Sequence, residues 1–112
     1  MASGVKTVIY PVSDLAAATA VFAALAGREP VVNAPYYVQF QLGGQAIGLD
    51  PHGHRHGGAV AYWHVEDVPG TVQQLVAAGA ETLEEPHDVG GGMLVAVLRD
   101  GDGNLIGLRQ AP

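Results

Sequence analysis

The sequence predicts an α+β fold that contains the same strand–helix–strand–strand–strand (βαβββ) module twice. Three observations predict it. The segments Val12–Leu15 and Val65–Val68 resemble each other, and each precedes an apolar run that closes at a Gly. Apolar and polar residues alternate in the flanking segments, which is typical of half-buried strands. Sixteen Gly and seven Pro among 112 residues indicate short elements joined by turns.

The first module is expected at about residues 5–50. An alternating run from Val5 to Val12 predicts a strand, and Ser13 or Asp14 can cap a helix at about 14–26 that Gly27 closes in a left-handed conformation. Gly43-Gly44 between two alternating runs indicates a hairpin. The three strands after the helix are expected at Pro30–Val32, Tyr36–Leu42 and Gln45–Asp50.

The second module is expected at about residues 59–110, after a linker at 51–58. A strand over Ala59–Val65 leads to Asp67, which can cap a helix at 68–78 that Gly79 closes. Glu84, Glu85, Pro86 and His87 are expected in a loop. The remaining strands are expected at Thr82–Leu83, Met93–Leu98 and Leu105–Arg109, with a turn at Asp100–Asn104 between the last two.

Helical periodicity predicts which side chains form the core. One face of the first helix is expected to bury Leu15, Val21, Phe22 and Leu25, and one face of the second Val68, Val72, Leu75 and Val76. Strand alternation turns Val38, Phe40 and Leu42 toward the first helix. Trp63 is expected in the core against the second helix, because a Trp buries a large apolar area.

The composition excludes several classes of protein. Apolar residues make up 48% and charged residues 14%, which is globular rather than disordered. A net charge of −6 with five Lys and Arg argues against nucleic-acid binding, which needs clustered cations. There is no Cys, so there is no disulfide and no thiolate site. We see no signal peptide and no membrane-length apolar run, and therefore expect a cytoplasmic protein without membrane contact.

These motifs resemble the vicinal oxygen chelate superfamily, which includes glyoxalase I, bleomycin-resistance proteins and extradiol dioxygenases. The resemblance spans nearly the whole chain, and Arg99–Ile106 looks like the family's Asp-Pro-Asp-Gly-Asn turn with Gly101 in place of Pro. It implies one domain, residues 1–112, in which two modules pair into an eight-stranded open half-barrel with helices outside. It also implies a ligand on the concave side and a homodimer.

The family's metal ligands are not retained. Carried over, their four positions fall on Thr7, Gly48, Val60 and Gly107, which offer one neutral hydroxyl among them. A shift of one residue along the last three strands restores no ligand. We therefore expect no metal and no cofactor at this position. His52, His54 and His56 in the linker form a separate short tract that could take up a metal, or be plain solvated loop.

The same face of the strands is expected to line the binding cleft. Alternation at plus or minus two residues selects side chains around the lost ligand positions. Loss of those ligands is expected to widen the cleft floor for a flat guest. The expected ligand-binding residues are Thr7, Ile9, Tyr37, Gln39, Gly48, Asp50, Val60, Tyr62, His64, Leu105, Gly107 and Arg109.

The sequence favours a binding protein over an enzyme. We expect metal-independent binding of the bleomycin-resistance type, with sequestration of an aromatic or amphipathic compound such as an antibiotic. The alternative is a lyase, an isomerase or a dioxygenase-like enzyme that uses His64 as a general base or relocated metal ligands. A third reading is a scaffold without a ligand. No catalytic residue is assigned.

Overall fold

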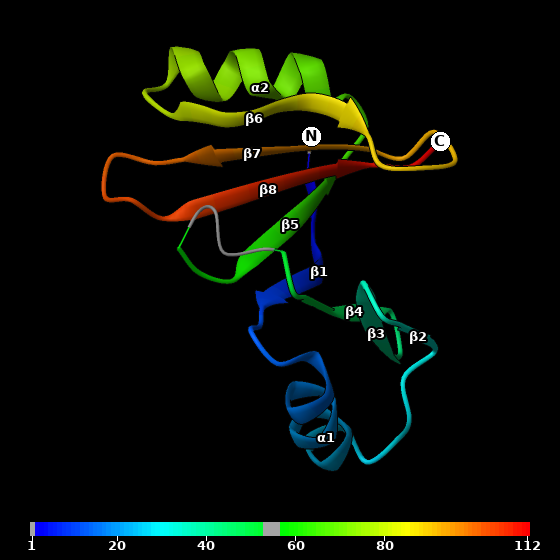
Figure 1. The fold of residues 1–112 in the computed structure, drawn as a ribbon. Coiled ribbons are helices and arrows are strands. Elements are labelled where there is room, and N and C mark those ends of the chain that lie inside the picture. Colours follow the sequence, from blue (N-terminus) through cyan, green and yellow to red (C-terminus); the bar gives the residue numbers. More distant parts are fainter. Residues whose placement is uncertain (1, 53–56) are drawn as a thin grey trace. The chain divides into compact units, whose positions relative to one another are not determined.

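A computed structural model describes residues 2–52 and 57–112. Eight strands and two helices follow one another in the order βαβββ twice, with parallel and antiparallel strand pairs (Figure 1). This confirms the predicted α+β class and the repeated module. The two helices begin at Leu15 and Val68, which are 53 residues apart, as the internal repeat predicts.

The chain divides into two compact units, which are described separately below. One unit is Lys6–Ala59, and the other joins the residues up to Val5 with Val60–Pro112. The first strand, β1 (Ala2–Pro11), therefore contributes its beginning to one unit and the rest to the other. The organisation of residues 1–112 as a single domain stays a prediction.

Four strands of the unit Lys6–Ala59 follow the order β2-β3-β4-β1. β1 pairs in parallel with β4 (Gln45–Asp50), while β3 (Tyr37–Leu42) pairs antiparallel with β4 and with β2 (Val32–Ala34). β2 begins two residues later than expected, and Pro30, the expected first residue, has no N–H to donate to a neighbouring strand. The first backbone donor there is Val31, whose N–H bonds the Gln39 carbonyl at 2.8 Å.

The helix of this unit, α1 (Leu15–Ala26), is held at both ends as predicted. Asp14 rather than Ser13 is the cap, since its carboxylate accepts the Ala17 N–H at 3.0 Å, and Gly27 closes the helix with φ 69°. Helix and sheet enclose a core centred on Val38, Phe40 and Leu49, which confirms that β3 turns its apolar side chains toward α1.

Part of the predicted helix face is wrong. Val21 is 65% exposed and Leu25 is 80% exposed, so neither is a core residue. The stripe that packs on the sheet includes Leu15, Ala18, Phe22 and Ala26, spaced by three or four residues along the helix. Val21 and Leu25 are four residues apart and lie on a neighbouring stripe of the helix. The predicted face was wrong because it included this second stripe.

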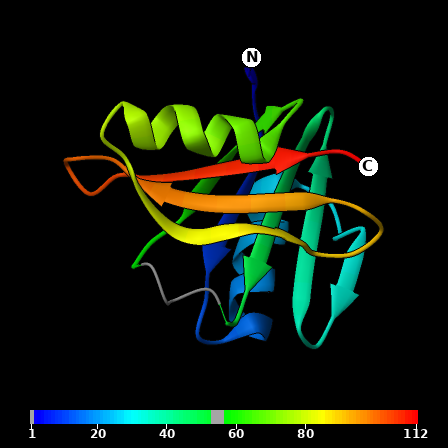
Figure 2. The same ribbon diagram turned by 90° about the horizontal axis from the view of Figure 1, so that it is seen from above.

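The strands of the second unit follow the order β5-β8-β7-β6. β5 (Val60–Val65) runs parallel to β8 (Leu105–Gln110), which is antiparallel to β7 (Leu94–Arg99). Figure 2 shows β7 between β8 and β6 (Glu81–Asp88). At the start of β1, the Ser3 hydroxyl donates a hydrogen bond of 3.3 Å to the His64 carbonyl of β5.

The strand β6 is much longer than the predicted Thr82–Leu83. It includes Glu84, Glu85, Pro86 and His87, which were wrongly expected in a loop. The pairing with β7 shifts in register between Thr82 and Glu84 and again between Glu84 and His87. A Pro is tolerated in a strand at the edge of a sheet or at a bulge. β6 is an edge strand, paired only with β7 in the described sheet, and its register shifts supply the bulge.

The second helix, α2 (Val68–Ala77), begins after Asp67, whose carboxylate accepts the Gly70 N–H at 3.1 Å. Gly79 follows the helix with φ 114°. α2 and the sheet bury a core that contains Val65, Val68, Val72, Ala96, Leu98 and Leu108. Val76 is exposed, and so was wrongly placed in this core. None of the helices in the described part of the chain is long and apolar enough to span a membrane.

The expectation for Trp63 is also wrong, because its side chain is 43% exposed. Val65 follows two residues later on β5 and faces the same side of the sheet. The core cluster under α2 includes Val65 and the cross-strand partner of Trp63, Leu108, but not Trp63 itself. The apolar contacts of α2 are therefore supplied by smaller side chains.

Candidate functional site

In each unit, the predicted site residues belong to the sheet face opposite the helix. Alternation along the strands separates them from the core residues that contact α1 or α2. On the first unit they are Thr7, Ile9, Tyr37, Gln39, Gly48 and Asp50. On the second unit they are Val60, Tyr62, His64, Leu105, Gly107 and Arg109.

The space beside Gly48 is filled by the ring of Tyr37. A Cβ built on Gly48 would lie 2.9 Å from the Tyr37 Cε1 and Cζ atoms and closer still to the hydroxyl oxygen. Gly48 pairs with Gln39 on β3, two residues from Tyr37, so the ring crosses diagonally over β4. The Tyr37 hydroxyl donates a 3.0 Å hydrogen bond to Gln39 Oε1, which holds the ring in this position.

Tyr62 fills the corresponding space beside Gly107 in the second unit. A Cβ on Gly107 would lie 2.6 Å from Cδ1, 2.7 Å from Cγ and 2.9 Å from Cε1 of Tyr62. Here the ring comes from the residue directly opposite, because Tyr62 on β5 pairs with Gly107 on β8. The contact involves the base of the ring, which cannot swing aside as easily as the far end of the Tyr37 ring.

The two tyrosines correct one expectation. Loss of the ligand side chains was expected to leave open space at Gly48 and Gly107, but a ring occupies that space at each. A larger residue could not enter either position unless the Tyr moved first.

The donors at the four metal-ligand positions do not fit a divalent ion. Gly48 and Gly107 have no side chain, Val60 has a buried hydrocarbon, and Thr7 is 3% exposed with a neutral hydroxyl. Divalent ions need carboxylate, imidazole or several oxygen ligands to replace their water. Within residues 2–52 and 57–112, no three His, Asp or Glu side chains cluster in a way that could hold a metal.

The candidate face of the second unit has an imidazole, that of His64, which can transfer a proton. It also has a guanidinium, that of Arg109, which is a permanent cation. These two residues are paired across β5 and β8 and both are half-buried. The Arg109 Nε donates to the Met93 sulfur at 3.2 Å, a contact that fixes the guanidinium stem. Met93 was not selected from the sequence as a site residue, because it precedes β7 and alternation does not place it.

Asp50 has a local structural role at the end of β4. Its Oδ1 accepts the His52 N–H at 2.8 Å, and its backbone carbonyl accepts the Val12 N–H at 3.1 Å. The carboxylate therefore orders the first residues of the linker. Of the remaining predicted residues, Ile9 and Leu105 are half-buried in β1 and β8.

Other histidines give no second site in the described residues. His87 on β6 is exposed, with Nδ1 2.8 Å from the Glu85 carbonyl and Nε2 3.7 Å from Glu84 Oε1. In the linker, His52 is described, while His54 and His56 lie outside the described residues. The possibility of a metal at the linker histidines therefore stays open.

The turn between β7 and β8 is fixed by one carboxylate. Asp100 Oδ1 accepts the backbone N–H groups of Asp102 and Asn104, and Oδ2 accepts the Asn104 side-chain amide at 2.9 Å. These bonds, those from Asn104 above all, stabilise the charged form and lower the pKa of Asp100 below its usual value. This is the turn whose sequence resembles the family motif.

A sequence profile of the Glyoxalase/Bleomycin resistance protein/Dioxygenase superfamily matches residues 4–108. The chain belongs to this superfamily. The match covers both modules and the Asp100 turn, and it confirms the resemblance seen in the sequence. None of the curated proteins matches the sequence.

Solved structures of the superfamily fold align along nearly the whole chain. A superfamily member from Vibrio splendidus 12B01 has 18% identity, a TM-score of 0.71, and coverage of 98% of both chains. A Streptomyces coelicolor methylmalonyl-CoA epimerase variant in complex with 2-nitronate-propionyl-CoA has 16% identity, a TM-score of 0.77, and coverage of 99% of this chain and 96% of its own.

A third similar structure is described as an NAD-dependent benzaldehyde dehydrogenase from Legionella pneumophila. It has 16% identity, a TM-score of 0.75, and coverage of 95% of this chain and 98% of its own. Identities of this size support the shared fold and not a shared activity, because the same fold carries many chemistries.

Proposed function

We propose that this superfamily member binds and sequesters a small aromatic or amphipathic molecule, such as an antibiotic, without a metal ion. The observation that carries the proposal is the pair of tyrosine rings over Gly48 and Gly107. Each ring takes the volume that a metal-ligand side chain needs, and each adds an aromatic surface to a sheet face. A tyrosine ring in place of a ligand side chain favours apolar contact with a guest over metal coordination.

On the second unit, the proposed contact surface consists of Tyr62, His64 and Arg109. A tyrosine ring stacks on an aromatic guest with about 0.5–1.5 kcal/mol beyond the burial of area. The Arg109 guanidinium offers a planar pair of donors for a carboxylate or carbonyl. On the first unit, Tyr37 and Gln39 are proposed for the same role, with a ring and an amide that hydrogen-bond each other.

An isomerase or lyase is the second candidate. The observations that favour it are the similarity to methylmalonyl-CoA epimerase structures and the pairing of His64 with Arg109 across β5 and β8. An imidazole can accept a proton as a general base, and the guanidinium paired with it across the strands can stabilise a developing oxyanion. We rank this candidate second because a binding role needs no further catalytic group.

Replacement of His64 distinguishes the two candidates. The protein is screened against aromatic natural products, α-keto acids and acyl thioesters, with calorimetry for binding and chromatography for product. The matched control is His87→Ala, which removes an exposed imidazole from the edge strand β6. A binder shows no product, and His64→Ala weakens its binding modestly. An enzyme loses turnover by about 10²–10⁴-fold in His64→Ala while it keeps binding, and that result would overturn the proposal.

We also propose that the protein is a cytoplasmic homodimer that contacts neither nucleic acid nor membrane. In the separate units, β2 and β6 are edge strands with one paired neighbour each. Edge strands expose unpaired backbone groups that association covers. The net charge of −6 opposes attraction to phosphates.

A further inference from the structure

We infer that the first unit has a separate binding site for a small apolar molecule of about the size of a benzene ring, between α1 and the sheet. This site lies on the helix-covered face of β1, β4 and β3. The proposed contact residues Tyr37 and Gln39 belong to the opposite face of the same sheet. The inference therefore goes beyond the proposed function and does not depend on it.

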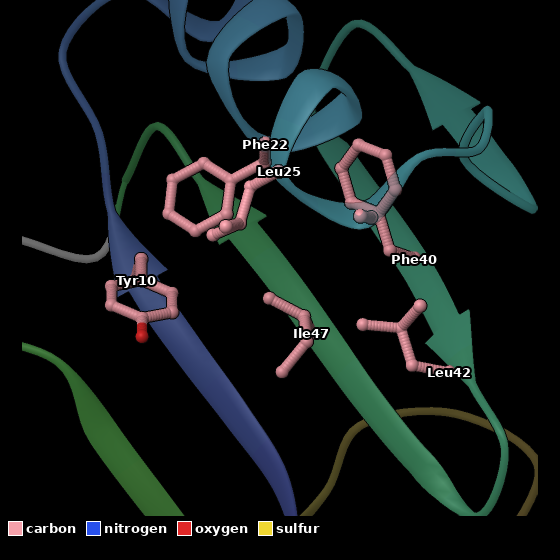
Figure 3. A pocket seen from close by; sticks show the side chains of 7 residues that line it. Tyr10, Phe22, Leu25, Phe40, Leu42 and Ile47 are labelled. Atoms are coloured by element: carbon pink, nitrogen blue, oxygen red, sulfur yellow. The ribbon is translucent and has the colours of Figure 1, made fainter.

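A pocket of about 160 Å³ lies between the C-terminal half of α1 and the strands (Figure 3). Its wall includes a ring pair, Tyr10 and Phe22, with centroids 4.9 Å apart and planes tilted by 47°. Phe40 lines it from within the core at 1% exposure, whereas Leu25 lies on the solvent side. The lining consists of Tyr10, Phe22, Leu25, Ala26, Phe40, Leu42 and Ile47.

The chemistry of this wall selects an apolar guest. Three of the seven lining side chains are aromatic, and the Tyr10 hydroxyl is the one polar side-chain group among them. Water needs two or more polar partners to be stable in a cavity, so it occupies such a space poorly. An enclosed apolar cavity of about 150 Å³ in another protein binds benzene, which gives the scale of the guest, whereas this pocket opens to solvent beside the exposed Leu25.

The small residue Ala26 keeps the pocket open. Apolar side chains normally pack against one another, and unfilled apolar space beside them forfeits packing contacts. A larger apolar side chain at position 26 could fill the space without a change in the helix, because Ala26 lies on the stripe of α1 that faces the sheet. The sequence instead combines Ala26 with the three aromatic rings.

Fluorobenzene is the probe that tests this site. The ¹⁹F signal of fluorobenzene is titrated with the whole protein, and ¹H–¹³C spectra of Ile47 and Leu42 methyl groups report where it binds. We expect saturable binding with shifts at these methyl groups. In Ala26→Leu the affinity falls by about tenfold or more, because the added side chain takes the guest's volume.

The matched control is Ala24→Leu, which adds the same side chain to an exposed position of α1 outside the lining. We expect its affinity for fluorobenzene to stay within about twofold of the wild type, since it leaves the pocket volume unchanged. Equal losses in Ala24→Leu and Ala26→Leu would overturn the assignment of this pocket.

A second variant keeps the inference testable if Ala26→Leu does not fold. Leu42→Ala enlarges the pocket, and we expect it to bind 1-fluoronaphthalene more tightly than the wild type does. Two results would overturn the inference. One is the absence of saturable fluorobenzene binding in both the wild type and Leu42→Ala. The other is that a second copy of the chain covers the pocket. In that case the NMR shifts of the Ile47 methyl groups change with protein concentration and do not change when the probe is added.

Discussion

The substitution Gly107→Ala measures directly whether the Tyr62 ring occupies the position of a lost ligand side chain. Alanine in place of glycine in a strand normally adds about 0.5–1 kcal/mol to the free energy of unfolding, because the unfolded chain loses freedom. The φ angle of Gly107 is not in the left-handed region, so the backbone accepts Ala. Any loss of stability in Gly107→Ala therefore reports the contact between the added methyl group and the Tyr62 ring.

The distances determine the sign of the effect. The Ala Cβ would meet three Tyr62 ring atoms at 2.6–2.9 Å, where ordinary contacts are 3.4–4 Å. The base of the ring has to move by several tenths of an ångström, and overpacking of this kind costs about 1–3 kcal/mol. After subtraction of the usual gain for Ala, we expect Gly107→Ala to be destabilised by about 0.5–2 kcal/mol.

The assay is urea unfolding of four proteins: wild type, Gly107→Ala, Tyr62→Ala and the double variant. In the Tyr62→Ala background the ring is gone, so Gly107→Ala should be neutral or slightly stabilising, with a coupling energy of about 1–3 kcal/mol. Gly44→Ala is the control, because nothing lies within 4 Å of its Cβ and its φ is not positive. A coupling energy of zero, with Gly107→Ala as stable as Gly44→Ala, would refute the reasoning.

Three further predictions concern the cap, the turn and the assembly. Asp14→Ala should lower the free energy of unfolding by about 0.5–2 kcal/mol in urea, whereas Ser13→Ala should leave it unchanged, since Asp14 accepts the Ala17 N–H. The pKa of Asp100, followed by the NMR shift of its carboxyl carbon, should lie below the usual value of about 3.9 and rise toward it in Asn104→Ala. Because this pKa is lowered by folding, its contribution to stability is present above about pH 4 and is lost as the pH falls through the folded-state pKa; an Asp100 pKa at or above the usual value would contradict this. Light scattering should give twice the mass of the 11.5 kDa chain, and a monomer at working concentration would refute the proposed homodimer.

Strand alternation and the internal repeat predicted the fold well because both are read from residues that are close together in the sequence. Val38 and Phe40 were assigned to the helix face from alternation alone, and Asp67 was assigned as a cap from its place before an apolar run. The extent of β6 was missed because Pro86 normally ends a strand, and the sequence does not show that β6 is an edge strand with register shifts.

The site was predicted less completely because it depends on contacts between strands. Gly48 and Gly107 provide no side chain at the carried-over ligand positions, and this was interpreted as open space. Which neighbour fills that space depends on strand register and side-chain rotamer. Tyr62 lies directly opposite Gly107, whereas Tyr37 reaches Gly48 diagonally, and neither relation follows from the spacing of residues in the sequence.

The most direct test of metal-independent binding is a ligand titration of chelator-treated protein, with and without added Ni²⁺ or Zn²⁺. An aromatic ligand found in the screen is titrated by calorimetry, and the same protein is then titrated with each metal alone. A variant with His52, His54 and His56 replaced by Ala removes the linker tract from the measurement. The account predicts the same affinity for the ligand with and without metal, and no one-to-one metal site in the triple variant. A tight stoichiometric metal site in that variant, with ligand binding or turnover that requires it, would contradict the account.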